Sequence, residues 1–286
     1  MSTLPIIYIV HGSWHSPIFF DPVKTRLESR GYQVICPQLP SMTGELPAVK
    51  TMYDDADPVR RDLENLIEDQ GQDVLLVMHS YGGIVGTQAA AGLGKAERRA
   101  AAVESQQQQG SSSGGGGGGG VIRLLYVCSF ILTEDEHLCQ PLGGEPAPFL
   151  KIEENGICIP VNPEQVFYQD LPVDEQKYWA TQVKPQPLIT QFNPMTKVAY
   201  KNIPVSYLYC ENDQALPCSI QKFFVERCRT TVDVTTFTCT AGHSPFLSQP
   251  DFFADLVVKV IHHDKRDISH MLACLLEKDM KSSRGQ

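Results

Sequence analysis

Ser80 stands at a point where the sequence changes abruptly from strand character to helix character. Residues 77–83 read Val-Met-His-Ser-Tyr-Gly-Gly, so an apolar run stops at a serine and continues into small residues. This pattern is typical of a nucleophile elbow, in which a strained turn exposes the serine hydroxyl at the end of a strand. Met78 stands where the G-x-S-x-G motif has its first glycine. The pattern predicts Ser80 as a catalytic nucleophile, and an ordinary helix N-cap serine is the alternative.

A nucleophilic serine needs a base, because its hydroxyl is a weak nucleophile at neutral pH. We expect this base to be a histidine that follows the last strand. Residues 241–245 read Ala-Gly-His-Ser-Pro and lie between the last strand-like run and the final helical pattern. The sequence therefore predicts His243 as the general base, and a loop histidine without a catalytic partner is the alternative.

A carboxylate should orient the base and complete the triad. Residues 207–217 end a strand-like run with two carboxylates, Glu211 and Asp213, of which Asp213 lies deeper in the following turn. We expect Asp213 to be the acid, with Glu211 as its local rival. Glu134 or Asp135, after the preceding strand, could serve instead in a rearranged triad.

Acyl transfer also requires two backbone N–H donors at the place where the oxyanion forms. One donor should be Tyr81, directly after the nucleophile. The other should come from the loop after the first strand, where Gly12 lets the backbone turn and the N–H of Ser13 faces the cleft. Trp14 and His15 could line the acyl pocket, or they could simply pack this loop.

The segments around these motifs alternate between strand and helix character, which predicts an α/β fold with a mostly parallel sheet. Strand-like runs occupy residues 5–10, 32–36, 74–79, 122–128, 205–210 and 232–239. Helical patterns occupy residues 21–31, 54–70 and 250–261. We therefore expect six strands flanked by helices, with the candidate catalytic residues in loops after the strands.

Three segments interrupt or extend this pattern. Residues 105–120 read SQQQQGSSSGGGGGGG and are expected to form a disordered insertion, since they offer nothing to bury. Residues 133–202 are rich in proline, glutamate and aromatics, and are expected to form a cap between a first core part (1–132) and a second one (203–262). Residues 263–286 keep helical spacing and predict a docked tail helix or a self-association surface.

The aromatic residues of the expected cap bear on the substrate. Those singled out are Phe149, Phe167, Tyr168, Tyr178 and Trp179. We expect them to favour a medium-sized apolar molecule over a polysaccharide or a peptide, with Tyr168 and Trp179 as candidate contacts. Taken one at a time, each of them is expected in the interior of the cap rather than in contact with the substrate.

The overall composition excludes several classes of partner. Among 286 residues, 33 are acidic and 24 basic, and no basic stripe stands out, which argues against nucleic acid and anionic membranes. The first strand-like run follows the initial Met closely, and we expect no signal peptide and no membrane span. Nine cysteines without a C-x-x-C pair suggest neither a disulfide framework nor a zinc site. We expect a soluble, cytoplasmic monomer or homodimer without metal or cofactor.

The motifs HGSWH, HSYGG, END and AGHSPF, in this order, resemble the α/β-hydrolase superfamily. The resemblance is nearest to the plant methylesterase and hydroxynitrile lyase group with its fungal and bacterial relatives, and it covers about residues 5–262. It implies a triad of Ser80, Asp213 and His243, and an oxyanion hole at Ser13 and Tyr81.

The resemblance specifies the fold more closely than it specifies the reaction. Hydroxynitrile lyases of this group have a lysine after the catalytic histidine and a threonine in the first oxyanion loop, where this chain has Ser244 and Gly12. Lyase activity is therefore disfavoured, and hydrolysis of an ester, thioester or lactone of a small apolar molecule is expected. A ligand receptor with vestigial turnover, or a cyclisation or C–C cleavage by the same serine and histidine, are the alternatives.

Overall fold

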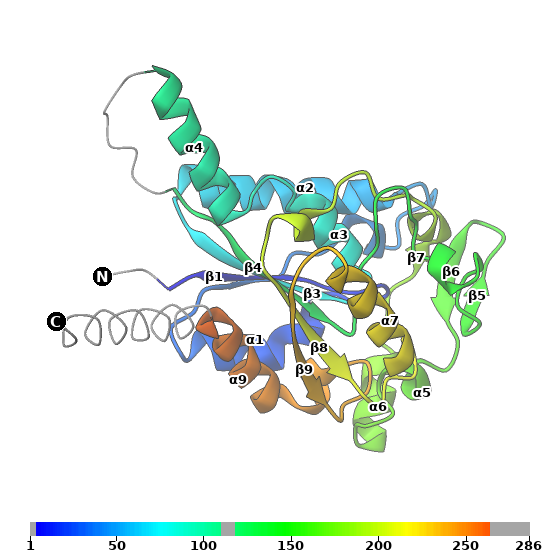
Figure 1. Cartoon of the computed structure of the whole chain (residues 1–286). Helices are drawn as coiled ribbons and strands as arrows, with labels where there is room; N and C mark the ends of the chain where they lie inside the picture. The colour runs from blue at the N-terminus through cyan, green and yellow to red at the C-terminus, as the bar shows by residue number, and fades with distance from the viewer. Residues whose placement is uncertain (1–3, 110–117, 264–286) are drawn as a thin grey trace.

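The fold is built on a six-stranded sheet in which all neighbouring strands are parallel (Figure 1). The computed structural model describes residues 4–109 and 118–263. The strands are β1 (Ile6–Val10), β2 (Val34–Ile35), β3 (Asp73–His79), β4 (Gly120–Val127), β8 (Val205–Cys210) and β9 (Val234–Cys239), in the order β2-β1-β3-β4-β8-β9. This confirms the expected sheet, although β2 keeps only two of the five residues predicted for it.

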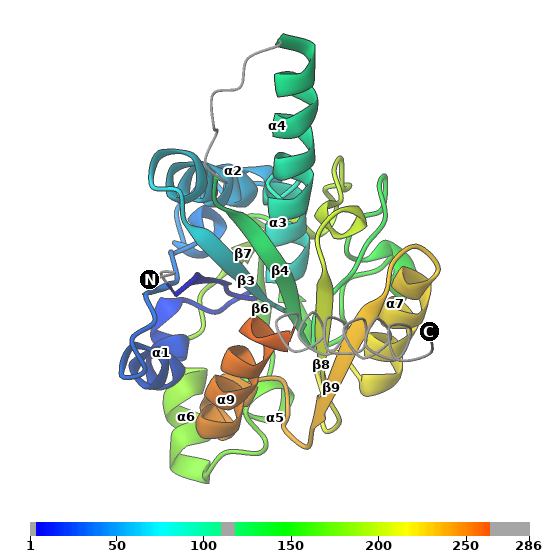
Figure 2. The same ribbon diagram turned by 60° about the vertical axis from the view of Figure 1, so that its left-hand side comes forward.

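Both faces of the sheet are buried, which explains why its strands are continuous apolar runs. Successive side chains of β1 alternate between two hydrophobic cores, with Ile6, Tyr8 and Val10 in one and Ile7 and Ile9 in the other. The helices of the first face are α2 (Met52–Glu64), α3 (Gly82–Ala89) and α7 (Cys218–Arg229). The helices of the second face are α1 (Asp21–Glu28) and α9 (Pro250–Ile261), which lie side by side (Figure 2).

Helix α2 begins and ends at sites that the sequence pattern only partly located. It starts two residues before the predicted Asp54, because Thr51 and Asp54 form a reciprocal capping box around its first turn. After Glu64 the chain continues as a π-helical turn, Asn65–Asp69. Gly71 then adopts a φ of +66°, which confirms the predicted glycine stop.

The expected disordered insertion at residues 105–120 was placed too widely. Helix α4 runs from Lys95 to Gln109, so residues 105–109 are helical, and Gly120 already belongs to β4. Glutamine is a good helix former, which allows α4 to continue through this polar stretch. Helix α4 extends well beyond the rest of the fold (Figure 2). The remainder of the insertion, residues 110–117, lies outside the described residues.

The greater part of residues 133–202 lies beyond the carboxyl ends of the main strands (Figure 1), and its last residues return past α3 to the start of β8. The segment contains a three-stranded antiparallel sheet that the sequence pattern did not predict, formed by β5 (Leu150–Ile152), β6 (Ile157–Pro160) and β7 (Gln186–Pro187). Helices α5 (Pro163–Phe167) and α6 (Val173–Ala180) also belong to this segment. The strands are too short to show alternation in the sequence, which is why they were missed.

Short helical turns connect these elements. They are η1 (Pro17–Phe20), η2 (Pro40–Met42), η4 (Gln140–Leu142), η5 (Leu188–Gln191), η6 (Ala199–Lys201) and α8 (Pro245–Ser248). Across the described chain, the helices are all too short or too polar to cross a bilayer. The predicted tail helix falls on residues 263–286, nearly all of which lie outside the described residues.

Candidate active site

Ser80 lies in a strained turn between β3 and α3. Its φ is +52°, a region that non-glycine residues rarely adopt, and its N–H donates to the carbonyl oxygen of Val127 over 3.2 Å. Gly82 allows α3 to start against β1, because a Cβ atom there would lie 2.2 Å from the carbonyl oxygen of Val10. The geometry is that of the predicted elbow.

The departure from the elbow motif at Met78 is compensated within α3. A Cβ atom on Gly86 would lie 2.5 Å from the Sδ atom of Met78, so the methionine side chain occupies the space that this glycine leaves open. The motif has its small residue on the strand, whereas in this chain the small residue at this contact is Gly86 on the facing helix. The presence of glycine at position 86 is the feature of the sequence that permits methionine at position 78, and the motif pattern alone did not indicate it.

His243 and Asp213 are brought together as predicted. The Nδ1–H of His243 donates to Oδ2 of Asp213 over 2.8 Å, and both side chains are buried. Oδ1 of Asp213 accepts the backbone N–H groups of Ala215 and Leu216, each over 2.8 Å, and Gln221 donates to Oδ2 over 3.2 Å. The carboxylate is thus saturated with donors, and its bond to Nδ1 selects the tautomer of the neutral imidazole in which Nε2 is the acceptor.

The rival carboxylates lie elsewhere. Glu211 is exposed, Asp135 is exposed, and Glu134 forms an ion pair with Lys201 over 3.2 Å. Asp213 is therefore the carboxylate that the fold presents to His243.

His79 supports the backbone of His243. Its Nε2 atom donates to the carbonyl oxygen of His243 over 2.9 Å, and the thiol of Cys128 donates to the same oxygen over 3.4 Å. Burial, followed by the proximity of His243, holds the pKa of His79 well below its usual range, so the ring is neutral. Potential metal-ligating atoms of His79, Cys128 and His243 lie within 4.8 Å of one another, but these hydrogen bonds already engage all three side chains.

The loop after β1 approaches the elbow closely. A Cβ atom on Gly12 would lie 2.9 Å from Cβ of Ser80 and 2.7 Å from Nδ1 of His79, so only glycine fits there. Within the described residues, the backbone N–H groups of Ser13 and Tyr81 have no acceptor, whereas that of Trp14 donates to Sδ of Met42 over 3.2 Å. Two unengaged N–H groups next to the candidate nucleophile match the requirement for an oxyanion hole.

The buried carboxylate of Asp55 makes hydrogen bonds both to Tyr81, next to the candidate nucleophile, and to Ser41, near the loop after β1. Asp55, on α2, accepts hydrogen bonds from the N–H of Ser41 (2.8 Å), the hydroxyl of Ser41 (2.6 Å) and the hydroxyl of Tyr81 (2.7 Å). Ser41 precedes Met42, the residue that holds the loop of Trp14. Burial raises the pKa of the Asp55 carboxyl to about 6. The sequence pattern had indicated no role for Asp55.

His15 packs the loop and does not line the pocket described below. Its Nδ1–H donates to the carbonyl oxygen of Ser13 (2.7 Å), and its Nε2 accepts the hydroxyl of Tyr168 (3.2 Å). Burial lowers the pKa of His15 to about 3. Tyr168 and Trp179, the predicted substrate contacts, pack on Phe19 with ring centroids 6.1 and 5.0 Å away. Both belong to the hydrophobic core on the α1 and α9 side of the sheet: Tyr168 directly follows α5, and Trp179 is the buried residue of α6.

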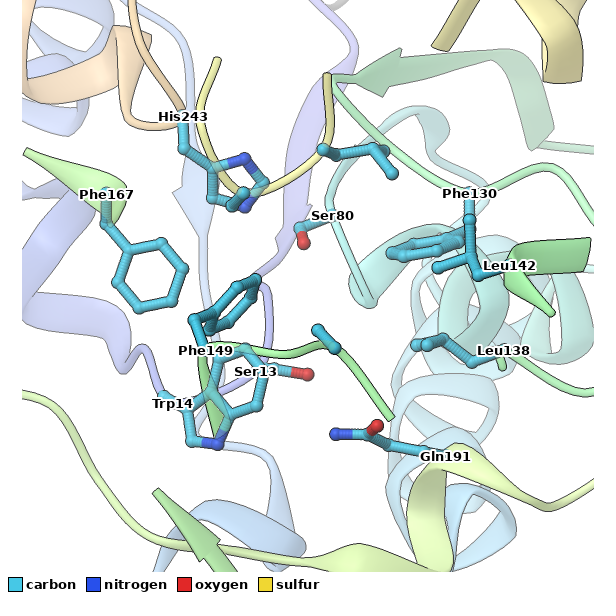
Figure 3. A pocket seen from close by; sticks show the side chains of 13 residues that line it. Ser13, Trp14, Ser80, Phe130, Leu138, Leu142, Phe149, Phe167, Gln191 and His243 are labelled. Atoms are coloured by element: carbon cyan, nitrogen blue, oxygen red, sulfur yellow. The ribbon is translucent and has the colours of Figure 1, made fainter. Parts of the chain in front are cut away.

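Ser80 and His243 open into one pocket of about 430 Å³, a volume that includes its mouth (Figure 3). One wall, the strand-loop wall, consists of Ser13, Trp14, Ser80, Phe130, Ala215, Leu216 and His243. The other wall, the 133–202 wall, consists of Leu138, Leu142, Ala147, Phe149, Phe167 and Gln191. Trp14, predicted as a contact, joins the two, since its ring stacks on Phe167 (5.7 Å) and meets Phe149 edge-on (6.0 Å). Of the 133–202 wall, the sequence pattern had singled out Phe149 and Phe167 and none of the other residues.

The 133–202 segment also holds the loops of the candidate triad. Oδ2 of Asp170 accepts the N–H of Gly242 over 2.7 Å, and the amide of Gln169 donates to the carbonyl oxygen of Asn212 over 2.6 Å. Gly242 precedes His243 and Asn212 precedes Asp213. Two adjacent residues outside the main sheet thus fix the loops that carry the base and the acid.

The parallel sheet, the strained serine after β3, and the acid and histidine after β8 and β9 are together the arrangement of the α/β-hydrolase fold. The chain belongs to the alpha/beta hydrolase family, whose model matches residues 7–256. This confirms the family that the sequence motifs suggested.

Relatives with the same fold include hydrolases from fungi, bacteria and plants. The chain is 29% identical over 265 residues to the alpha/beta hydrolase nvfD of Aspergillus novofumigatus, which covers 91% of this chain and 96% of the relative. A pyrethroid hydrolase from Sphingobium faniae superposes with a TM-score of 0.68 at 20% identity, covering 91% and 98% of the two chains. The methylesterase MES16 from Arabidopsis superposes with a TM-score of 0.63 at 15% identity, covering 90% and 99%.

Proposed function

We propose that this protein is a serine hydrolase that cleaves an ester, thioester or lactone of a medium-sized apolar molecule. The observation that carries the proposal is that Ser80 and His243 face one pocket while His243 is bonded to the buried Asp213. Membership of the hydrolase family supports the reaction class. The printed names of the relatives, a pyrethroid hydrolase and a methylesterase, agree with ester chemistry.

The reaction follows from the protonation states of these groups. Nε2 of His243 accepts the proton of the Ser80 hydroxyl as its oxygen bonds to the substrate carbonyl carbon. Asp213 stabilises the imidazolium, and the N–H groups of Ser13 and Tyr81 bind the oxyanion. The imidazolium then protonates the leaving alcohol, thiol or ring oxygen, leaving an acyl group on Ser80. Water, deprotonated by His243, releases the acid and restores the serine.

The pocket lining favours an apolar substrate. Nine of the thirteen lining residues are apolar or aromatic, and the indole N–H of Trp14 is already engaged with the carbonyl oxygen of Cys158 over 3.2 Å. Six of the thirteen come from residues 133–202, and for this reason we propose that this segment acts as a cap over the site. No metal or cofactor takes part in the proposed steps.

Labelling with a fluorophosphonate probe tests the proposal. We expect rapid modification of the peptide that contains Ser80, and no modification of S80A. Ser29→Ala, an exposed serine at the end of α1, is the matched control and should label as the wild type does. A folded wild-type protein that resists the probe would contradict the proposal and favour a ligand receptor. Product analysis with the unlabelled enzyme separates hydrolysis from cyclisation or C–C cleavage.

A further inference from the structure

The 133–202 wall carries one buried amide among apolar side chains. Gln191 ends η5, is 1% exposed and lines the pocket. Figure 3 shows its amide directed into the pocket, on the side opposite His243. The remaining residues of this wall are leucine, alanine and phenylalanine. A polar group in such surroundings costs free energy unless it finds a hydrogen-bond partner.

The partners that Gln191 has within the protein are weak. In the described part of the chain, they are two thiols: Cys139 donates to Oε1 over 3.6 Å, and Nε2 donates to the sulfur of Cys158 over 3.6 Å. Burial raises the pKa of both thiols to about 11, so they are neutral and remain poor donors and acceptors at neutral pH. A side-chain amide has two N–H donors and two lone pairs. One donor and one lone pair of Gln191 therefore stay available.

Neighbouring polar groups do not use this capacity. The hydroxyl of Thr190 donates to the carbonyl oxygen of Pro187 over 2.8 Å. Ser41 and Tyr81 donate to Asp55. The buried side-chain amide of Gln186 on β7 makes no hydrogen bond within the described residues, so it does not use this capacity either. The Gln191 amide therefore faces the space that a substrate would fill.

We propose that Gln191 is a specificity-determining residue that binds a carbonyl or hydroxyl oxygen at the end of the substrate remote from the bond that is cleaved. This inference rests on the proposed hydrolase function, and it narrows the substrate class. The substrate is an ester, thioester or lactone with an apolar body and one uncharged polar oxygen at its far end. A carbonyl oxygen accepts the free N–H of Gln191, and a hydroxyl can also donate to its free lone pair.

Matched pairs of esters test the inference. The probes are para-nitrophenyl esters of straight-chain acids of increasing length, each paired with its analogue that has a ketone at the penultimate carbon. At the length where the ketone reaches Gln191, we expect the wild type to prefer the keto ester, by kcat/KM, about tenfold over its parent. Q191L should lose this preference. Leu142→Met, which alters the same wall without changing polarity, should keep it.

A second variant and a binding measurement keep the outcomes distinct. Q191M replaces the amide by an unbranched apolar chain and serves if Q191L fails to fold. The same pairs, as methyl esters, are also bound to S80A and to the double variant S80A/Q191L, and binding is followed by tryptophan fluorescence, since Trp14 lines the pocket. A keto preference in S80A that Q191L removes supports the inference, even where the wild type hydrolyses no ester and the hydrolase proposal falls.

The opposite pattern would overturn the inference and leave the hydrolase proposal intact. In that case the wild type hydrolyses keto and parent esters at every length with a ratio that Q191L and Q191M do not change. A lower melting temperature of both variants with unaltered ratios would then identify Gln191 as a brace between Cys139 and Cys158.

Discussion

The two walls of the pocket differ in origin and in chemistry. Behind the strand-loop wall, hydrogen bonds fix the position of His243: its carbonyl oxygen has two donors, and its partner Asp213 has four. In the 133–202 wall, Gln191 has two thiol partners, and the other residues offer only apolar contact. Under the proposed function, the first wall would stabilise charge that develops in the reaction, and the second would bind the body of the substrate.

Mutations in the two walls can test this difference. Changes to the polar groups of the strand-loop wall, or to the residues that position them, should act on kcat, because these groups would meet the reacting atoms. Changes in the 133–202 wall should act on KM and on the choice of substrate.

The largest effect is expected for Asp213→Asn. The asparagine cannot hold His243 in the tautomer that leaves Nε2 free, and kcat for para-nitrophenyl butyrate should fall by about 10⁴-fold. Glu211→Gln, the exposed neighbour, is the matched control and should remain near the wild-type rate. Equal losses of kcat in both variants would contradict the assignment of Asp213 as the acid of the triad.

Gly12→Ala should have the next largest effect. The added Cβ atom would lie within 3 Å of both Ser80 and His79, which must displace the loop that carries the Ser13 amide. Loss of one oxyanion donor costs about 10²-fold in kcat, and KM should change little. Steady-state kinetics beside a circular dichroism spectrum of the variant would separate this loss from unfolding. A kcat within twofold of the wild type would exclude Ser13 as an oxyanion donor.

Phe149→Ala tests the other wall. Phe149 is half-buried and touches Trp14 and Phe167, so its removal shortens the apolar contact with a substrate. We expect KM to rise about tenfold with kcat nearly preserved, as for the loss of roughly 1–2 kcal/mol of apolar burial. Phe252→Ala, a partly exposed phenylalanine on α9, should change neither constant. A selective fall in kcat would contradict the division of labour between the walls.

Asp55→Asn should reveal a smaller effect, on the pH dependence of stability. Burial raises the pKa of Asp55 to about 6, above the value near 4 of an unfolded chain. Between these values the folded protein keeps a proton that the unfolded chain has released, so this group makes stability fall as the pH rises from about 4 to 6. The variant should lack this fall, a difference on the order of 1–3 kcal/mol.

Urea unfolding across that pH range measures the Asp55 effect. Asp57→Asn, an exposed acid on the same helix, is the control and should follow the wild-type profile. Parallel profiles for the wild type and Asp55→Asn would show that the pKa of Asp55 is not raised in the folded protein.

The sequence allowed the main sheet and the positions of Ser80, Asp213 and His243 to be predicted because their signals are local. Apolar runs of strand length, the helix stop at Gly71 and the serine before Gly82 each reflect a steric demand within a few residues. Asp213 and His243 could be located by their position after strands. The exchange between Met78 and Gly86 needed the packing of a helix on a strand, which spacing alone does not give.

The 133–202 wall was predicted poorly for the same physical reason. Tyr168 and Trp179 looked like contacts because they are aromatic, yet they pack on Phe19 in the core. Gln191 looked unremarkable in the sequence, and its place depends on how η5 meets the antiparallel sheet. In this region tertiary packing, and not residue type, decides which side chains reach the pocket.

The bonds from Gln169 and Asp170 to the loops of the acid and the base carry a consequence for evolution and protein engineering. A lid joined to the core only by hinges could be exchanged between homologues to transplant substrate preference. Here an exchanged segment would also release the backbone of Gly242 and Asn212, so a chimaera would lose turnover along with its old selectivity. Recombination should therefore succeed only where the junctions leave residues 169 and 170 with the host core.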